Sequence, residues 1–364
     1  MKKIAYLLIL SLLFTLLPVE SAQAATKVSG PTVTAVYDKK LDDFKYKFSH
    51  SNKNAKIYYR DCSNIDRRWK QIKNGATVKM PWYCKSSDIY VYAQVGKTKS
   101  KARRVSLWDV DDKTVDSLIK KEMSKVVSKG DNKVTKFMKL LVYFKQNYDY
   151  IWLDDNKRDS TETKTFYRRG GMCWELAVIF ERYCKAIGIK AETVTDHTVD
   201  YEYSSNHAWN HVYLDQYPII VDPTSVVMVD RINDDGAILT NQDSIAKSKF
   251  KLTSSKALLY KFAGSYEVDV EDTIWVAEEY AFDAILSEQA SDIKISNNKI
   301  SYIWNEPADL DYGTEAYTVR YEMRYYPEDG YWYGFTYDLD GNLLHDGKAE
   351  VDAWYAAHPE VERK

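Results

Sequence analysis

The stretch Arg-Gly-Gly-Met-Cys-Trp-Glu, at residues 169–175, marks a sharp entry into an amphipathic helix. Two adjacent glycines allow a tight backbone approach and dihedral angles that are closed to other residues. Apolar residues then recur at spacings of three, four and three, which predicts the buried face of a helix, and Gly188 predicts its end. Cys173 is therefore expected in the first turn, where unpaired N–H groups and the helix dipole lower the pKa of a thiol. The apolar positions are Ala177, Phe180, Cys184 and Ile187.

Three strands are predicted after this helix, over residues 189–195, 206–214 and 217–224. The second strand carries His-Ala-Trp-Asn-His and the third ends in Asp-Pro-Thr. A thiol becomes a strong nucleophile when a base lies beside it and an acceptor orients that base. A cysteine, a histidine and an aspartate in this chain order supply the three roles.

The pairing of the last two strands decides which histidine lies near Asp222. If Asp215 and Gln216 form a two-residue turn, Trp209 faces Asp222, and His207 and His211 are both diagonal neighbours of that carboxylate. Two four-residue turns are alternatives: one puts Asp222 directly opposite His211 and the other puts it opposite His207. The strand register alone leaves the choice of histidine open.

Four blocks of this sequence resemble the core of the transglutaminase-like superfamily. They are Gly-Met-Cys-Trp-Glu-Leu-Ala at 171–177, Gly-Ile-Lys-Ala at 188–191, His-Ala-Trp-Asn-His-Val at 207–212 and Val-Asp-Pro-Thr at 221–224. Tyr-Asp-Tyr at 148–150 is similar to a short segment often found upstream. The resemblance covers roughly residues 130–230 and implies a papain-like α+β fold, with a helix packed on an antiparallel sheet.

Residue by residue, the resemblance implies Cys173 as nucleophile, His207 as base and Asp222 as the group that orients the histidine. It implies acyl transfer: the thiolate attacks an amide carbonyl to give a thioester, and His207 protonates the leaving amine. Water as the acceptor makes the protein a protease or amidase, whereas an amine makes it a cross-linker. The backbone N–H of Cys173 is one expected oxyanion donor.

Three more residues near the expected site have two interpretations each. Trp174 and Trp209 either line a substrate groove or pack around the triad, and His211 is either a plain strand residue or a partner of the triad. A zinc site formed by Cys173, Cys184, His207 and His211 is an alternative, but ten residues between two cysteines do not match structural zinc spacing. The sequence therefore predicts neither a metal nor a cofactor.

The chain is predicted to have four parts: a signal peptide at 1–24, a β-sandwich at 25–108, the catalytic domain at 109–240 and an acidic α+β domain at 241–364. The first part has two lysines, an apolar run of 14 residues and an Ala-Gln-Ala cleavage site. Residues 28–108 alternate as strands of a sandwich do. Together these features predict a secreted or cell-surface protein, with no integral membrane segment after signal cleavage.

The chain has four cysteines, and export would allow disulfides to form. Cys62 and Cys84 lie in one β-rich segment, so a bridge between them is predicted. Cys173 and Cys184 are 11 positions apart on one expected helix, roughly 16 Å along its axis, which is beyond the reach of a disulfide. A free Cys173 is therefore compatible with an oxidising environment.

Charge is divided unevenly along the chain. Residues 265–364 contain 23 acidic and 7 basic residues, whereas residues 25–264 contain 42 basic and 29 acidic ones. Either both parts are simply solvated, or the basic part approaches an anionic surface such as a cell-wall polymer. The expected partner is a protein or a peptide-containing polymer, with no nucleic acid. The alternative function is a non-catalytic module that binds cell wall or a protein partner.

Overall fold

The computed structural model describes residues 27–63, 65–152, 162–195, 207–214, 218–228, 239–240, 289–308, 315–329 and 331–360. The predicted signal peptide and residues 241–288 lie outside this set. The chain divides into two compact units, residues 1–111 and 112–364, and each is described by itself. The described helices include none that is long and apolar enough to cross a membrane.

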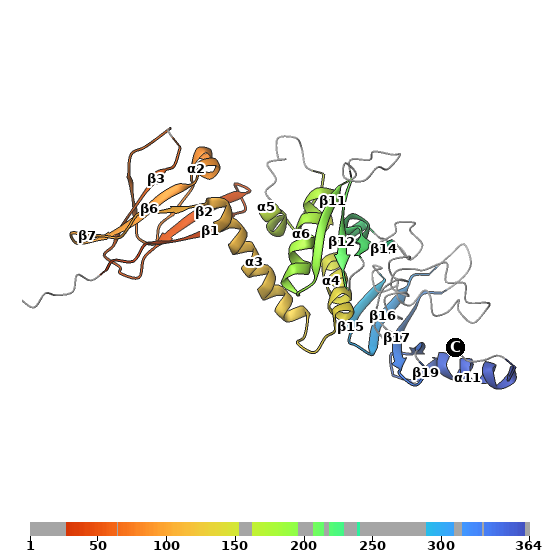
Figure 1. The fold of residues 1–364 in the computed structure, drawn as a ribbon. Helices are drawn as coiled ribbons and strands as arrows, with labels where there is room; N and C mark the ends of the chain where they lie inside the picture. Colours follow the sequence, from red (N-terminus) through yellow and green to blue (C-terminus); the bar gives the residue numbers. More distant parts are fainter. Residues whose placement is uncertain are drawn as a thin grey trace, which may run out of the picture. The chain divides into compact units, whose positions relative to one another are not determined.

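The first unit is built from two antiparallel sheets (Figure 1). The first sheet has the order β1 (Thr32–Asp38), β2 (Asp43–Ser49), β5 (Thr77–Val78). The second has the order β4 (Lys70–Lys73), β3 (Lys56–Asp61), β6 (Ile89–Val95), β7 (Thr98–Lys99), and β8 (Arg103–Val105) also pairs with β6. Alternate residues of β2, β3 and β6 are buried, and the rings of Phe48 and Tyr59 lie 6.0 Å apart between the sheets. The two inner faces therefore share one core, as the alternation in the sequence predicts.

Cys62 and Cys84 are free thiols, so the predicted disulfide is wrong for this structure. Cys84 lies on the short helix α2 (Trp82–Ser87) and is turned into the core, with 1% of its surface exposed, whereas Cys62 follows β3 and is half-exposed. Spacing along the chain indicates the length of a loop, but a bridge also needs two Cβ atoms that point at each other. Burial raises the pKa of the Cys84 thiol to about 11, which makes it a poor nucleophile.

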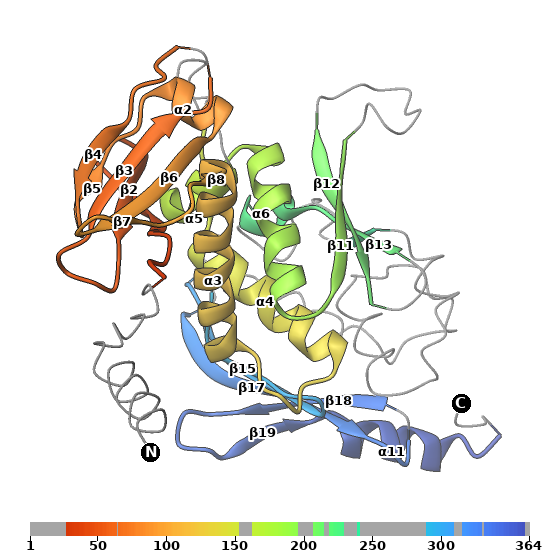
Figure 2. The same cartoon turned by 60° about the vertical axis from the view of Figure 1, so that its left-hand side comes forward.

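In the second unit, a helix lies on an antiparallel sheet (Figure 2). The sheet has the order β11 (Lys190–Thr195), β12 (Ala208–Tyr213), β13 (Pro218–Val221), β14 (Leu239–Thr240). Helix α6 (Cys173–Ala186) packs on β11 and β12, and the fully buried Asn210 on β12 donates to the carbonyl of Ala177 on α6 over 3.0 Å. The predicted papain-like α+β arrangement is confirmed.

Three helices and a pair of short strands surround α6. They are α3 (Leu107–Val126), α4 (Lys133–Asn147), α5 (Glu162–Arg168), β9 (Asp149–Tyr150) and β10 (Gly170–Gly171). Asn132 caps α4, because its side chain accepts from the backbone N–H of Thr135. Arg182 of α6 donates to Asp116 of α3 over 3.0 Å. These contacts hold α6 from the side opposite the sheet.

The third predicted strand is shorter than expected, because Pro223 begins helix α7 (Pro223–Met228) and the strand ends at Val221. Asp222 lies between the two elements, and its Oδ1 accepts from the N–H of Thr224 over 2.9 Å. Proline at the first helical position after a capping aspartate is a favourable helix start.

The end of the chain forms a five-stranded antiparallel meander followed by a helix (Figure 1). Its elements are β15 (Ala290–Ile295), β16 (Lys299–Glu306), β17 (Tyr317–Tyr326), β18 (Tyr331–Tyr337), β19 (Leu343–Asp346) and α11 (Gly347–Ala357). Residues 338–342 turn the chain between β18 and β19, with Gly341 at a φ of +94°. β-rich regions thus lie at both ends of the chain.

Candidate active site

Cys173 is the first residue of α6, as the sequence predicts. The preceding Met172 is extended, and its N–H donates to the buried carboxylate of Glu175 over 3.1 Å. Leu176, Ala177, Phe180 and Cys184 form the buried side of the helix. The first N–H groups of a helix have no partner within it, so the Cys173 sulfur lies at the positive end of the helix dipole.

The two glycines before Cys173 lie where no side chain fits. A Cβ on Gly170 would be 2.4 Å from Cδ1 of Ile151, and one on Gly171 would be 2.7 Å from Cβ of Glu175. Their backbone runs parallel to β9, and the N–H of Ile151 donates to the carbonyl of Gly171 over 3.0 Å. The glycines therefore allow the close strand pairing that fixes the entry to α6.

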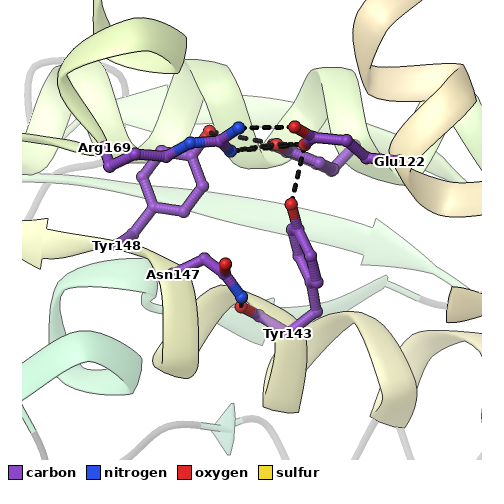
Figure 3. Close-up of polar contacts among 6 residues, drawn as sticks. Glu122, Tyr143, Asn147, Tyr148 and Arg169 are labelled. Carbon is purple, nitrogen blue, oxygen red and sulfur yellow. Dashed lines mark hydrogen bonds and ion pairs between the residues drawn. The ribbon is translucent and has the colours of Figure 1, made fainter.

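Arg169, directly before the two glycines, is held by a cluster of polar side chains (Figure 3). Its guanidinium binds Glu122 of α3 over 2.5 Å and donates to the hydroxyls of Tyr148 and Tyr183 over 3.3 and 3.0 Å. The hydroxyls of Tyr183 and Tyr143 both donate to Oε2 of Glu122 over 2.7 Å. Arg169 has a φ of +58°, which is costly for a side chain of this size. The polar cluster offsets this cost and holds the turn that presents Cys173.

His207 and Asp222 are hydrogen-bonded, with 2.8 Å between Nε2 and Oδ2. The register of β12 and β13 pairs Asn210 with Val221, and one step further along the ladder this register puts Trp209 across from Asp222. This is the register that a two-residue turn predicts, and in it His207 is the histidine that binds the carboxylate. His211 pairs instead with Ile220 and with Glu192.

The thiol of Cys173 is hydrogen-bonded to His207, and this contact is the main reason that the pKa of the thiol is lowered. The backbone N–H groups of Ala208 and Trp174 lower the same pKa further, whereas burial opposes them. Asp222, and after it Cys173, raises the pKa of His207 to about 10. Because Nε2 of His207 is hydrogen-bonded to Asp222, Nδ1 is the ring nitrogen that is available to the Cys173 sulfur. The two shifts both favour a thiolate beside an imidazolium.

The three remaining predicted residues lie around this group but differ in role. Trp174 is 44% exposed beside the sulfur. The ring of Trp209 lies 6.1 Å from that of His207, and its buried Nε1 has no hydrogen-bond partner among the described residues. Burial lowers the pKa of His211, which faces Glu192 across the sheet rather than Asp222. Within the part of the chain that the structure describes, no group of three or more His, Cys, Asp or Glu side chains could hold a metal ion.

Two parts of the site were missed from the sequence. The N–H of Ala208 contacts the Cys173 sulfur, and a backbone group leaves no signal in residue types. The cluster of Glu122 and Arg169 joins two residues that are far apart in the chain. An arginine directly before two glycines was the one visible signal for it.

Comparison with known proteins gives one family match and one solved structure. Residues 121–223 match the family model described as the transglutaminase-like superfamily, a range that contains Cys173, His207 and Asp222. No curated protein matches. One solved structure, titled a "Putative Cysteine Protease" from Cytophaga hutchinsonii, is 16% identical, covers 55% of this chain and 74% of its own, and has a TM-score of 0.25. Residues 121–223 of this chain are thus similar to the transglutaminase-like superfamily.

Proposed function

We propose that the chain is a cysteine enzyme that transfers acyl groups from amides through a thioester on Cys173. The observation that supports this proposal is the hydrogen-bonded series from Cys173 through His207 to Asp222. It unites a thiol of lowered pKa, a base of raised pKa and a fixed carboxylate, which are the parts that nucleophilic catalysis needs.

In the proposed acylation step, the Cys173 thiolate attacks the amide carbon and forms a C–S bond, while the carbonyl π electrons move to oxygen. When the tetrahedral intermediate collapses, the C–N bond breaks and the Nδ1 proton of His207 goes to the leaving amine. In the second step, water or an amine attacks the thioester, gives a proton back to His207 and releases the thiolate. The N–H of Cys173 at the start of α6 is a donor for the oxyanion.

The Asp222 carboxylate is suited to orient the imidazole through both steps. Its Oδ2 accepts from His207, while its Oδ1 is held by the N–H of Thr224. A carboxylate fixed on both oxygens keeps Nε2 protonated, so that Nδ1 is the nitrogen that exchanges its proton with sulfur and substrate.

We further propose that the enzyme acts outside the cell on proteins or on a peptide-containing polymer. The support for this proposal is the leader-like pattern of residues 1–24. The half-exposed Trp174 beside the sulfur is an apolar surface of the kind on which peptide side chains bind.

The test is to incubate the protein with dimethylcasein, with or without dansylcadaverine, and to measure released ammonia, casein fragments and bound label. Hydrolysis of glutamine side chains gives ammonia alone, hydrolysis of the peptide chain gives casein fragments without ammonia, and amine transfer to glutamine side chains gives both ammonia and bound label. Cys173→Ala should abolish all turnover, and Cys62→Ser, which removes a half-exposed thiol elsewhere, should leave it intact. Trapping with hydroxylamine should yield a hydroxamate only when Cys173 is present. Equal turnover by Cys173→Ala and the parent protein would exclude the thioester route.

A further inference from the structure

One face of the second sheet in the N-terminal unit is rich in cations, and of these Arg104 binds a carboxylate, that of Asp88, over 2.8 Å. Along β3 and β6 every second residue is buried, so the alternate residues point away from the core. The strand pairings extend this outward set across β4, β7 and β8. We call it the basic–aromatic face, and it consists of five cations, three tyrosines and two glutamines.

The face is arranged in rows that run across the strands. In one row, Lys73 pairs with Lys56, Lys56 with Gln94, and Gln94 with Lys99. In the next row, Gln71 pairs with Tyr58, and Tyr58 with Tyr92. Two residues along a strand separate neighbouring rows by roughly 7 Å. A band of tyrosines therefore has a row of lysines on one side.

The third row places arginines on the other side of the tyrosine band. Arg60 pairs with Tyr90, which pairs with Arg104. Asp88 neutralises Arg104 over 2.8 Å, so Arg60 is the cation of this row that is available to a ligand. The guanidinium of Arg60 lies 5.2 Å from the ring of Trp69 and 5.1 Å from that of Tyr90. Its Nε is buried without a hydrogen-bond partner, and within the described residues it forms no ion pair. Two aromatic rings hold this cation in place and leave its charge unneutralised.

The lysines of the face are unneutralised as well. Lys56 and Lys73 are exposed directly opposite each other, a like-charge pairing that destabilises a sheet. Neither they nor Lys99 joins an ion pair among the described residues. Elsewhere in the same unit, cationic side chains form ion pairs with carboxylates, for example Lys85 with Asp43 over 2.6 Å. An anionic ligand over the face would remove the repulsion.

The aromatic rings favour one class of anion over another. Tyr58 and Tyr92 stack on each other at 4.8 Å and 10°, and Trp69 meets Tyr92 edge-on at 4.7 Å. Lys99 lies over the ring of Tyr92 at 5.5 Å. Tyr58 and Tyr92 thus each cover one face of the other, whereas single-stranded nucleic acid binds by stacking bases on free ring faces. Phenol, amide and cationic groups remain at the surface, and these recognise hydroxyls and carboxylates.

We propose that the basic–aromatic face binds an anionic polysaccharide, with the sugar chain lying along the tyrosine band and its acidic groups between the two rows of cations. The proposed binding site contains none of the residues Cys173, His207 and Asp222. Its test is therefore independent of the test of the proposed enzyme activity. The leader predicted at residues 1–24 would bring the face to polysaccharides outside the cell.

The test measures binding of the whole protein to polygalacturonate, to neutral dextran and to oligo-dT, by titration at low and at physiological salt. One variant changes Lys56, Arg60, Lys73 and Lys99 to Gln. The matched control changes Lys113, Lys120, Lys121 and Lys125 of α3 to Gln, four lysines outside the face with the same total charge. A milder variant, Lys73→Gln with Lys99→Gln, guards against misfolding of the first, and iodoacetamide labelling of Cys173 reports an intact second unit.

We expect polygalacturonate to bind in a salt-sensitive manner and dextran not to bind. The fourfold face variant should bind at least tenfold more weakly, the milder variant by a smaller factor, and the α3 control within about twofold of the parent. Three results would overturn the proposal: no binding of polygalacturonate, equal weakening by the α3 control, or tighter binding of oligo-dT than of polygalacturonate at equal charge concentration.

Discussion

The replacement His207→Ala tests the electrostatic core of the site. In the parent protein, the contact with His207 is the largest cause of the lowered pKa of Cys173. Without the imidazole, burial still raises the thiol pKa, and only the N–H groups of Ala208 and Trp174 oppose it. The pKa of the variant thiol should therefore be higher than that of the parent thiol.

The magnitude follows from two opposing effects on alkylation by iodoacetamide. At a pH well below the pKa of both thiols and below the His207 pKa of about 10, a thiol pKa that is higher by one lowers the thiolate fraction about tenfold. The more basic thiolate is about threefold more reactive, which recovers only part of that loss. The variant should thus react about threefold more slowly for every tenfold loss of thiolate. At high pH the order reverses, because both thiols are ionised and the more basic one reacts faster.

The other three cysteines should not interfere with this assay. Burial raises the pKa of Cys62, Cys84 and Cys184, so at pH 6.5 the label should map to Cys173 alone by peptide mass spectrometry. His211→Ala, on the same strand but paired with Glu192, is the control and should keep the parent profile. Identical pH–rate profiles for His207→Ala and the parent would refute the thiolate–imidazolium pair.

Three more outcomes are expected. Gly170→Ala places a Cβ 2.4 Å from a neighbouring side chain, so thermal or urea unfolding should show a loss of about 1–3 kcal/mol, whereas Gly130→Ala, in open space, should be nearly neutral. Arg169→Met leaves a partly buried carboxylate without its cation; partial exposure of both side chains discounts the cost to about 1–3 kcal/mol, measured in the same way. Amide turnover should fall as pH rises through about 10, because His207 then loses the proton that the leaving amine needs, and Asp222→Asn should move that fall to lower pH in a pH–kcat profile.

Local patterns predicted the elements that carry the site. The spacing of Ala177, Phe180 and Cys184 indicated α6, and Gly188, at a φ of +79°, stands just past its end as expected. The three strands after it were also predicted, because alternation and turn residues are local signals. The third strand was too long, since Asp-Pro at 222–223 was interpreted as part of a strand rather than as a helix start.

Features that depend on tertiary contacts could not be predicted from the sequence. The choice between His207 and His211 depended on a strand register, and three registers were compatible with the residues. Cys62 and Cys84 are free in the structure, and residue spacing alone does not fix the distance or geometry between two thiols. Pairing across the sheet and burial are properties of the folded chain and become visible only there.

The three residues of the site share one structural property, which is that each lies at the end of an element. Cys173 begins α6, His207 immediately precedes β12, and Asp222 immediately follows β13. Element ends expose backbone N–H groups and allow side chains to leave the plane of the sheet. The buried Asn210 links these ends, because it pairs with Val221, donates to Ala177 over 3.0 Å and lies three residues after His207. The helix and the two strands therefore cannot shift separately, and the geometry of the thiol, imidazole and carboxylate depends on the packing of α6 on the sheet more than on any one contact among the three.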